Sequence, residues 1–97
     1  MIGPIHPGVT LHEDFMEPYE LSTNRLSKAL GIPQSRISDI VRGRRGITAA
    51  TALRLERAFG ISGSFWLNLQ SHYELEVAER DKGSAIRKSV KRLARAA

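Results

Sequence analysis

The 97-residue chain contains no cysteine, which excludes disulfide bonds and metal sites built on thiolates. It has no apolar run long enough to cross a bilayer. Its first residues lack both the basic segment and the apolar stretch of a secretory signal. No run alternates apolar and polar residues between turn signals, so a β-sheet is not expected either. These absences leave the expectation of one small helical domain in the cytoplasm.

The residue patterns of enzymes are also missing. His6, His12 and His72 are not spaced as metal ligands, either with each other or with acids. The glycine-containing stretch 42–46 has no Lys-Ser or Lys-Thr pair and no preceding strand, so it does not match a phosphate-binding loop. We therefore expect no catalytic residue, no cofactor, no metal and no small-molecule substrate.

Charged residues are distributed unevenly along the chain. Residues 1–20 contain four acids and neither lysine nor arginine, whereas residues 82–97 contain six bases and no acid. Between them, residues 21–60 carry a net charge of +6 and residues 61–81 a net charge of −3. A basic block is what binding to DNA phosphates requires, and the middle block also contains a recurring two-helix motif.

That motif is a helix-turn-helix over residues 23–42. Ser27 supplies a small side chain where two helices cross, and Gly31, four residues later, supplies a turn residue that tolerates a positive φ. Ile37 and Ile40 follow at helical spacing and give the second helix an apolar inner face. The opposite face has polar side chains, several of them short, which suit a helix that enters the major groove of DNA.

Turn and capping residues divide the rest of the chain into helices. They predict an all-α bundle of five helices and a further basic helix at the C-terminal end. The expected domain covers residues 1–81, and residues 82–97 form a basic tail or helix. For the five helices in order, the predicted start and stop residues are Pro7 and Pro18, Ser22 and Gly31, Pro33 and Arg42, Thr48 and Gly60, and Ser62 or Ser64 and Gly83. Ser84 is the predicted start of the further basic helix.

The outer face of the motif contains the candidate DNA contacts. Gln34 is suited to read adenine, and Asp39 can accept from cytosine or can instead pair with Arg36 or Arg42 and orient it. The full set of candidate base readers is Gln34, Ser35, Ser38 and Asp39. The candidates for phosphate binding are Ser22, Thr23, Arg36, Arg42, Arg44 and Arg45, and of these Arg44 or Arg45 could reach the adjacent minor groove.

Three stretches together resemble the HigA antitoxins, a branch of the lambda-repressor-like helix-turn-helix proteins. They are His6-Pro7-Gly8 with Leu11, Phe15, Pro18 and Leu21-Ser22; the motif with Gly43-Arg44-Arg45-Gly46-Ile47-Thr48; and Phe65 to Gln70 with Tyr73-Glu74-Leu75. The resemblance covers roughly residues 6–75. The chain departs from the family pattern at Val9-Thr10, and the basic tail lies beyond the part that matches.

The resemblance implies a lambda-repressor-like fold and the antitoxin of a type II toxin–antitoxin pair. Such a protein is cytoplasmic and associates with the nucleoid when it is bound to DNA. It neutralises a HigB-like toxin, an mRNA endonuclease, and represses its own operon by binding a palindromic operator as a homodimer. A stand-alone transcriptional repressor without a toxin partner is the alternative.

The surfaces that would bind the protein partners are less well defined by sequence. The acids Glu13, Asp14 and Glu17 could face a basic toxin, or could be ordinary solvated surface. Phe65, Trp66 and Leu69 could form a partner patch, although apolar residues at helical spacing are usually core. Reading a palindrome requires a two-fold axis, and the candidate dimer seam is Trp66, Leu69 and Tyr73.

The basic tail has several interpretations. It could follow phosphates outside the operator core, lie on the toxin, or be a frayed end. A helix on a membrane surface is disfavoured, because the tail has neither tryptophan nor phenylalanine.

Overall fold

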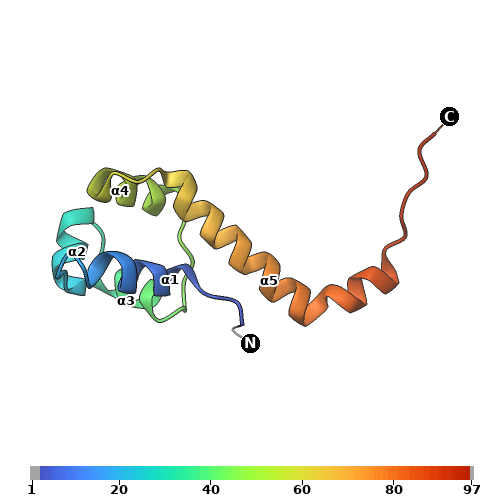
Figure 1. Ribbon diagram of the computed structural model, residues 1–97, viewed down its shortest axis with the longest axis horizontal. Helices are drawn as coiled ribbons and strands as arrows, with labels where there is room; N and C mark the ends of the chain where they lie inside the picture. The colour runs from blue at the N-terminus through green and yellow to red at the C-terminus, as the bar shows by residue number, and fades with distance from the viewer. Residues whose placement is uncertain (1–2, 97) are drawn as a thin grey trace.

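The structure, a computed structural model, describes residues 3–96 and contains helices but no β-strand in that range (Figure 1). Residues 1, 2 and 97, the ends of the expected domain and tail, lie outside it. The helices are α1 (Pro7–Thr10), η1 (Leu11–Met16), α2 (Thr23–Leu30), α3 (Gln34–Val41), α4 (Ala49–Phe59) and α5 (Gly63–Ser89). The π-helix η1 continues α1 without a break, so the expected first helix consists of these two segments. The all-α prediction is confirmed. No helix within residues 3–96 is both long and apolar enough to span a membrane.

Helices α2 and α4 begin and end where their capping residues predict. The Ser22 hydroxyl accepts from the Arg25 N–H at 3.1 Å and begins α2, and Thr48 likewise accepts from Thr51 at the start of α4. Gly31 ends α2 with a φ of 70°, the left-handed conformation that the motif requires. The turn of the helix-turn-helix therefore forms from local sequence.

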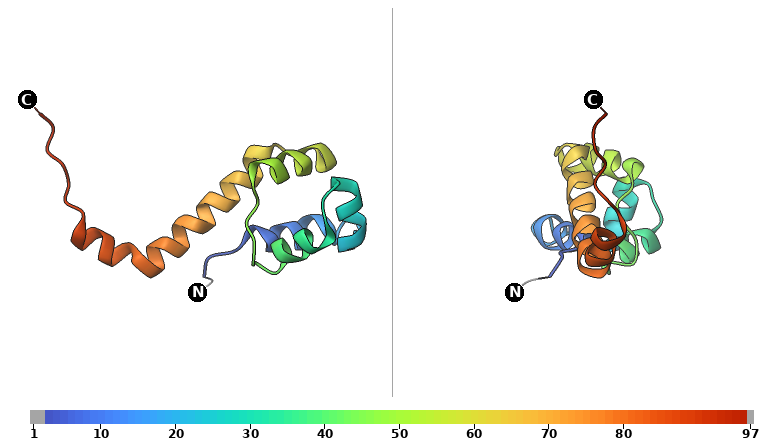
Figure 2. Two further views of the ribbon diagram at one scale, coloured as in Figure 1. Left: turned by 180° about the vertical axis from the view of Figure 1, so that it is seen from behind. Right: turned by 90° about the vertical axis from the view of Figure 1, so that its right-hand side faces the viewer.

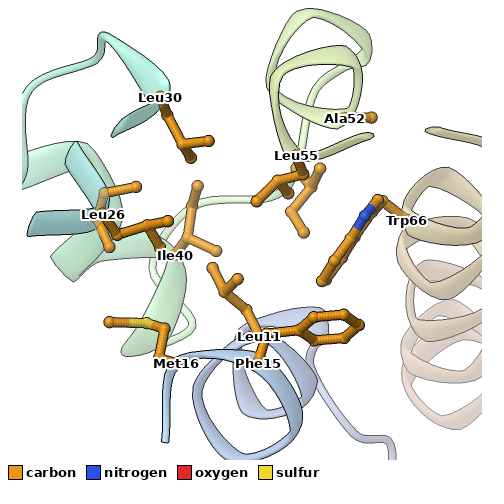
Figure 3. Close-up of a cluster of buried hydrophobic side chains, with 11 residues drawn as sticks. Leu11, Phe15, Met16, Leu26, Leu30, Ile40, Ala52, Leu55 and Trp66 are labelled. Carbon is orange, nitrogen blue, oxygen red and sulfur yellow. The ribbon is translucent and has the colours of Figure 1, made fainter. Parts of the chain in front are cut away.

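A single hydrophobic core joins η1 and helices α2, α3, α4 and α5 (Figure 3). Trp66 of α5 is fully buried, and its ring lies 4.7 Å from that of Phe15 in η1. Ile37 and Ile40 of α3 are also fully buried, as the spacing predicts. These two side chains fix α3 to the body of the domain.

Gly8 sets how closely α1 approaches the end of α3. A Cβ built at Gly8 would overlap the carbonyl oxygen of Ile40 and lie 2.7 Å from its carbonyl carbon. The same Cβ would lie 3.0 Å from the Cα of Val41. Because these neighbours are backbone atoms, they cannot move aside as a flexible side chain would.

The prediction of a separate basic helix after Gly83 is wrong. Residues 82–89 continue α5, and residues 90–96 have no regular structure. The absence of a Cβ at Gly83 leaves room for an ion pair between Glu79 and Arg87, whose Oε1 and Nη1 atoms are 2.6 Å apart. Helix α5 leaves the body and changes direction in its distal half (Figure 1), the region that contains Gly83.

Candidate nucleic-acid interface

The outer face of α3 presents the predicted base readers to solvent. Gln34 and Ser35 are exposed, whereas Ser38 and Asp39 are half-buried. Helix α2 crosses α3 next to this face, with Ser27 buried at the crossing. Helices α2 and α3 lie on one side of the body, with α1 and η1 toward the other (Figure 2, right).

The side chain of Gln34 is held by the first turn of α2. Its Nε2 donates to the Thr23 hydroxyl at 3.0 Å, and its Oε1 accepts from Asn24 Nδ2 at 3.3 Å. An amide group has a second N–H and a second lone pair, so a bidentate contact to a base is still available. Sequence reasoning missed Asn24; its signal is its position in the first turn of α2, which packs against the first turn of α3.

The N-terminal end of α2 can receive a phosphate. Ser22 is exposed and Thr23 half-buried, and the N–H groups of a first helical turn have no partner within the helix. The Ser22 hydroxyl accepts at the cap and keeps its own hydrogen free to donate. A phosphate candidate, Thr23, therefore directly contacts a base-reading candidate, Gln34.

Asp39 pairs with Arg44. The distance from Arg44 Nε to Asp39 Oδ1 is 3.4 Å, and the backbone N–H groups of Arg44 and Arg45 donate to the Asp39 carbonyl at 2.8 and 3.2 Å. The alternative prediction for Asp39, an ion pair with Arg36 or Arg42, is therefore wrong, because the partner is Arg44. Both side chains of the pair are partly exposed, so the ion pair is weak and Arg44 is free to reach DNA.

Residues 42–46, named here the arginine loop, contain three of the arginines that are candidates for phosphate binding. Arg42, Arg44 and Arg45 are exposed at its surface, while Arg36 is half-buried on α3. Immediately after the loop, the N–H of Ile47 donates to Gln70 Oε1 on α5 at 2.8 Å. The loop is therefore held by α3 through Asp39 and by α5 through Gln70.

His6 lies under the arginine loop. Its Nδ1 accepts from the Gly8 N–H at 2.9 Å and begins α1, and its ring stands edge-on to that of Tyr73 at 4.9 Å. Burial lowers the pKa of His6 below its ordinary value of 6.5, and a hydrogen bond to the Arg45 backbone opposes this shift more weakly. His6 is therefore a neutral capping residue.

A pH dependence of stability follows from His6. Its folded pKa is lowered, so its contribution is complete above pH 6.5 and is lost as the pH falls through the folded pKa. We expect His6→Asn, whose side-chain oxygen can still cap α1, to lack this loss of stability below about pH 6.5. Thermal unfolding followed by circular dichroism measures the difference, and because His12 and His72 stay in both proteins, it isolates His6. Parallel pH profiles for the two proteins would contradict the assignment.

The acidic candidates for toxin binding lie on the surface of η1. Glu13, Asp14 and Glu17 are all exposed on η1 and its end. Glu17 pairs with His12, with 3.2 Å between Oε1 and Nδ1. These acids therefore belong to η1 and its end, and none of them lies on α3.

The predicted dimer seam needs one correction. Trp66 is fully buried in the core of a single chain, so its side chain cannot face a second copy. Leu69 and Tyr73 are half-buried, and Tyr73 is partly occupied by His6. The more accessible apolar side chains of α5 lie farther along, where Leu75 is 71% exposed and Ile86 48% exposed.

Known proteins resemble this chain in both sequence and fold. Residues 14–66 match the helix-turn-helix family. The chain is 54% identical over 80 residues to virulence-associated protein I of Dichelobacter nodosus, covering 82% of this chain and 74% of that protein. The structure of a HigA-family addiction module antidote protein from Coxiella burnetii superposes with a TM-score of 0.90 at 43% identity, covering 95% of this chain and all of the other. The chain belongs to the HigA family of helix-turn-helix proteins.

A second HigA-family structure was determined with DNA. Pseudomonas aeruginosa antitoxin HigA with the higBA promoter matches this HigA-family chain with a TM-score of 0.90 and 41% identity, covering 94% of this chain and 99% of the other. The structural likeness thus extends well past residues 6–75, into the distal part of α5 that sequence alone did not match.

Proposed function

We propose that this HigA-family protein is a cytoplasmic antitoxin that represses its own operon. As a homodimer it binds a palindromic operator and associates with the nucleoid, and separately it binds and neutralises a HigB-like endonuclease toxin. These functions require binding surfaces and no catalytic residue. The observation that carries the DNA-binding part is the exposed Gln34 amide, fixed by Thr23 and Asn24 beside the arginine loop.

The geometry supports a division of roles within the interface. Gln34 reads a base, with Ser35 and Ser38 beside it on the same helix face, because its amide is held at the exposed end of α3. Asp39 orients Arg44. Phosphates are bound by the start of α2 and by the exposed arginines, which set the register of α3 in the groove.

Gln34→Ala tests the base-reading role. We expect the preference for operator over unrelated DNA to fall about tenfold, while binding to unrelated DNA stays the same. Fluorescence anisotropy with both DNA duplexes at one salt concentration measures the ratio. Ser64→Ala, an exposed change on the remote α5 N-terminus, is the control. An unchanged ratio for Gln34→Ala would show that another helix face reads the operator.

The homodimer is supported by the exposed apolar side of α5. Leu69 lines one shallow groove with Leu75, and Leu75 lines another with Ile86. Burying these side chains against a second copy would remove apolar surface from water. We assign the dimer contact to this side of α5, with Leu69 at its inner end; Tyr73, which packs against His6, lies on another side of the helix.

The toxin-binding part is supported by charge and placement. An RNA-cleaving partner is expected to be basic, and Glu13, Asp14 and Glu17 are exposed acids on η1 and its end rather than on α3. Toxin and operator could then bind to different sides of one protein.

Co-expression with the neighbouring open reading frame tests the antitoxin function. Rescue of growth from a toxic neighbour, together with a complex that co-purifies, is the expected result. A harmless neighbour that does not co-purify would favour the stand-alone repressor. In that case the Gln34→Ala experiment would still identify the DNA-reading helix.

A further inference from the structure

We propose that Gln70 of α5 is a positioning residue that sets the arginine loop for contact with DNA phosphates. This inference rests on the proposed operator binding and deepens it, because it assigns part of the interface to a buried residue of α5. Only 9% of Gln70 is exposed.

Both halves of the Gln70 amide have a defined partner. Oε1 accepts from the buried N–H of Ile47 at 2.8 Å, and Nε2 donates to Glu74 Oε2 at 2.8 Å. Burying an amide costs free energy unless its hydrogen bonds are made, so an apolar residue would suit this position better if packing were its only role. Glu74 accepts but cannot donate, so it fixes which end of the amide faces Ile47.

The chain passes so close to Gln70 that a side chain at Gly46 would displace the Gln70 amide. A Cβ at Gly46 would lie 2.8 to 2.9 Å from the amide atoms of Gln70. The φ of Gly46 is not positive, so this contact rather than backbone conformation explains the glycine. The end of the arginine loop therefore rests directly on the Gln70 side chain.

Backbone hydrogen bonds thus hold the arginine loop at two points. At its beginning, the N–H groups of Arg44 and Arg45 donate to the Asp39 carbonyl. At its end, Ile47 donates to Gln70. Loss of the second anchor would leave the two arginines attached to α3 alone, so their direction relative to the DNA would no longer be fixed by the domain.

An exchange of the amide and the carboxylate tests this role. Gln70→Glu keeps an acceptor for Ile47 but places a second carboxylate against Glu74, and we expect it to weaken operator binding about three- to thirty-fold. In the double variant Gln70→Glu/Glu74→Gln the two groups change places, and an amide can again donate to a carboxylate. Operator binding should then return to within about twofold of the wild-type value.

A double-mutant cycle separates positioning from a general loss of structure. Arg44→Ala should cost less in the Gln70→Glu protein than in the wild type, because Arg44 is already misdirected there. Arg36→Ala, on α3, should cost the same in both proteins. The emission of Trp66, the single tryptophan and fully buried, reports whether each variant is folded.

Glu74→Ala gives a second route if Gln70→Glu does not fold. It removes only the exposed partner of the amide, and we expect a smaller loss of operator affinity in the same direction, with faster hydrogen exchange at Ile47. If the losses of operator affinity caused by Gln70→Glu and Arg44→Ala were additive, the proposal would be overturned. It would also be overturned if hydrogen exchange at Ile47 became faster while operator affinity stayed unchanged. If the wild type itself bound no operator, the proposed function would fail, while the exchange data would still report on the anchor.

Discussion

Gly8→Ala is expected to destabilise the domain by about 3 kcal/mol or more, a large part of the stability of a chain this size. The added methyl would overlap the Ile40 carbonyl oxygen and press on the Val41 Cα, both backbone atoms of α3. Relief requires α1 and α3 to separate, which opens the core at Leu11 and Ile40. Because α3 is the helix that we propose reads the operator, we expect operator binding to be lost together with stability.

Thermal and urea unfolding followed by circular dichroism measure this effect. Gly3→Ala is the matched control, because a Cβ at Gly3 would meet nothing within 4 Å. The control should unfold like the wild type to within about 0.5 kcal/mol. A wild-type unfolding midpoint for Gly8→Ala would mean that α1 does not lie against α3 in solution.

The double variant Arg44→Ala/Arg45→Ala is expected to bind DNA roughly fifty-fold more weakly near 0.1 M salt. Two lost phosphate contacts also reduce the slope of log affinity against log salt by about 1.8. Both side chains are exposed on the arginine loop, so the loss should be alike for operator and unrelated DNA, and the fold should remain intact.

Lys91→Ala/Arg92→Ala removes the same charge from the tail and is the control. These residues lie beyond the end of α5, in the part without regular structure. We expect their removal to leave the salt slope close to that of the wild type. Equal losses for the two double variants would show that net charge, rather than the arginine loop, determines the binding.

The helix-turn-helix could be predicted because local chemistry fixes it. Ser22 and Gly31 bound α2 through a hydroxyl cap and a left-handed φ, which depend on neighbouring residues only. The spacing of Ile37 and Ile40 determines which side of α3 is buried, since an exposed apolar face would be unstable. These features hold whatever the rest of the chain does.

Contacts between distant residues could not be predicted in the same way. Gln34 meets Asn24 and Asp39 meets Arg44 because of how α2, α3 and the arginine loop are placed, which spacing does not encode. At Gly83, a helix-weakening residue was expected to break α5, but the Glu79–Arg87 ion pair crosses it. The sequence pattern around Trp66 fits either a core residue or a residue that binds a partner. Its complete burial depends on how the other helices pack around it.

The tie between Gln34 and α2 has a consequence for the evolution of operator preference. A new side chain at position 34 would leave the Thr23 hydroxyl and the Asn24 amide without their present partner, at the same surface that meets DNA. Those two groups would then be free to bond to bases or phosphates themselves. Retargeting such a protein to a different operator should therefore proceed through sets of three substitutions, and related sequences should show positions 23, 24 and 34 changing together.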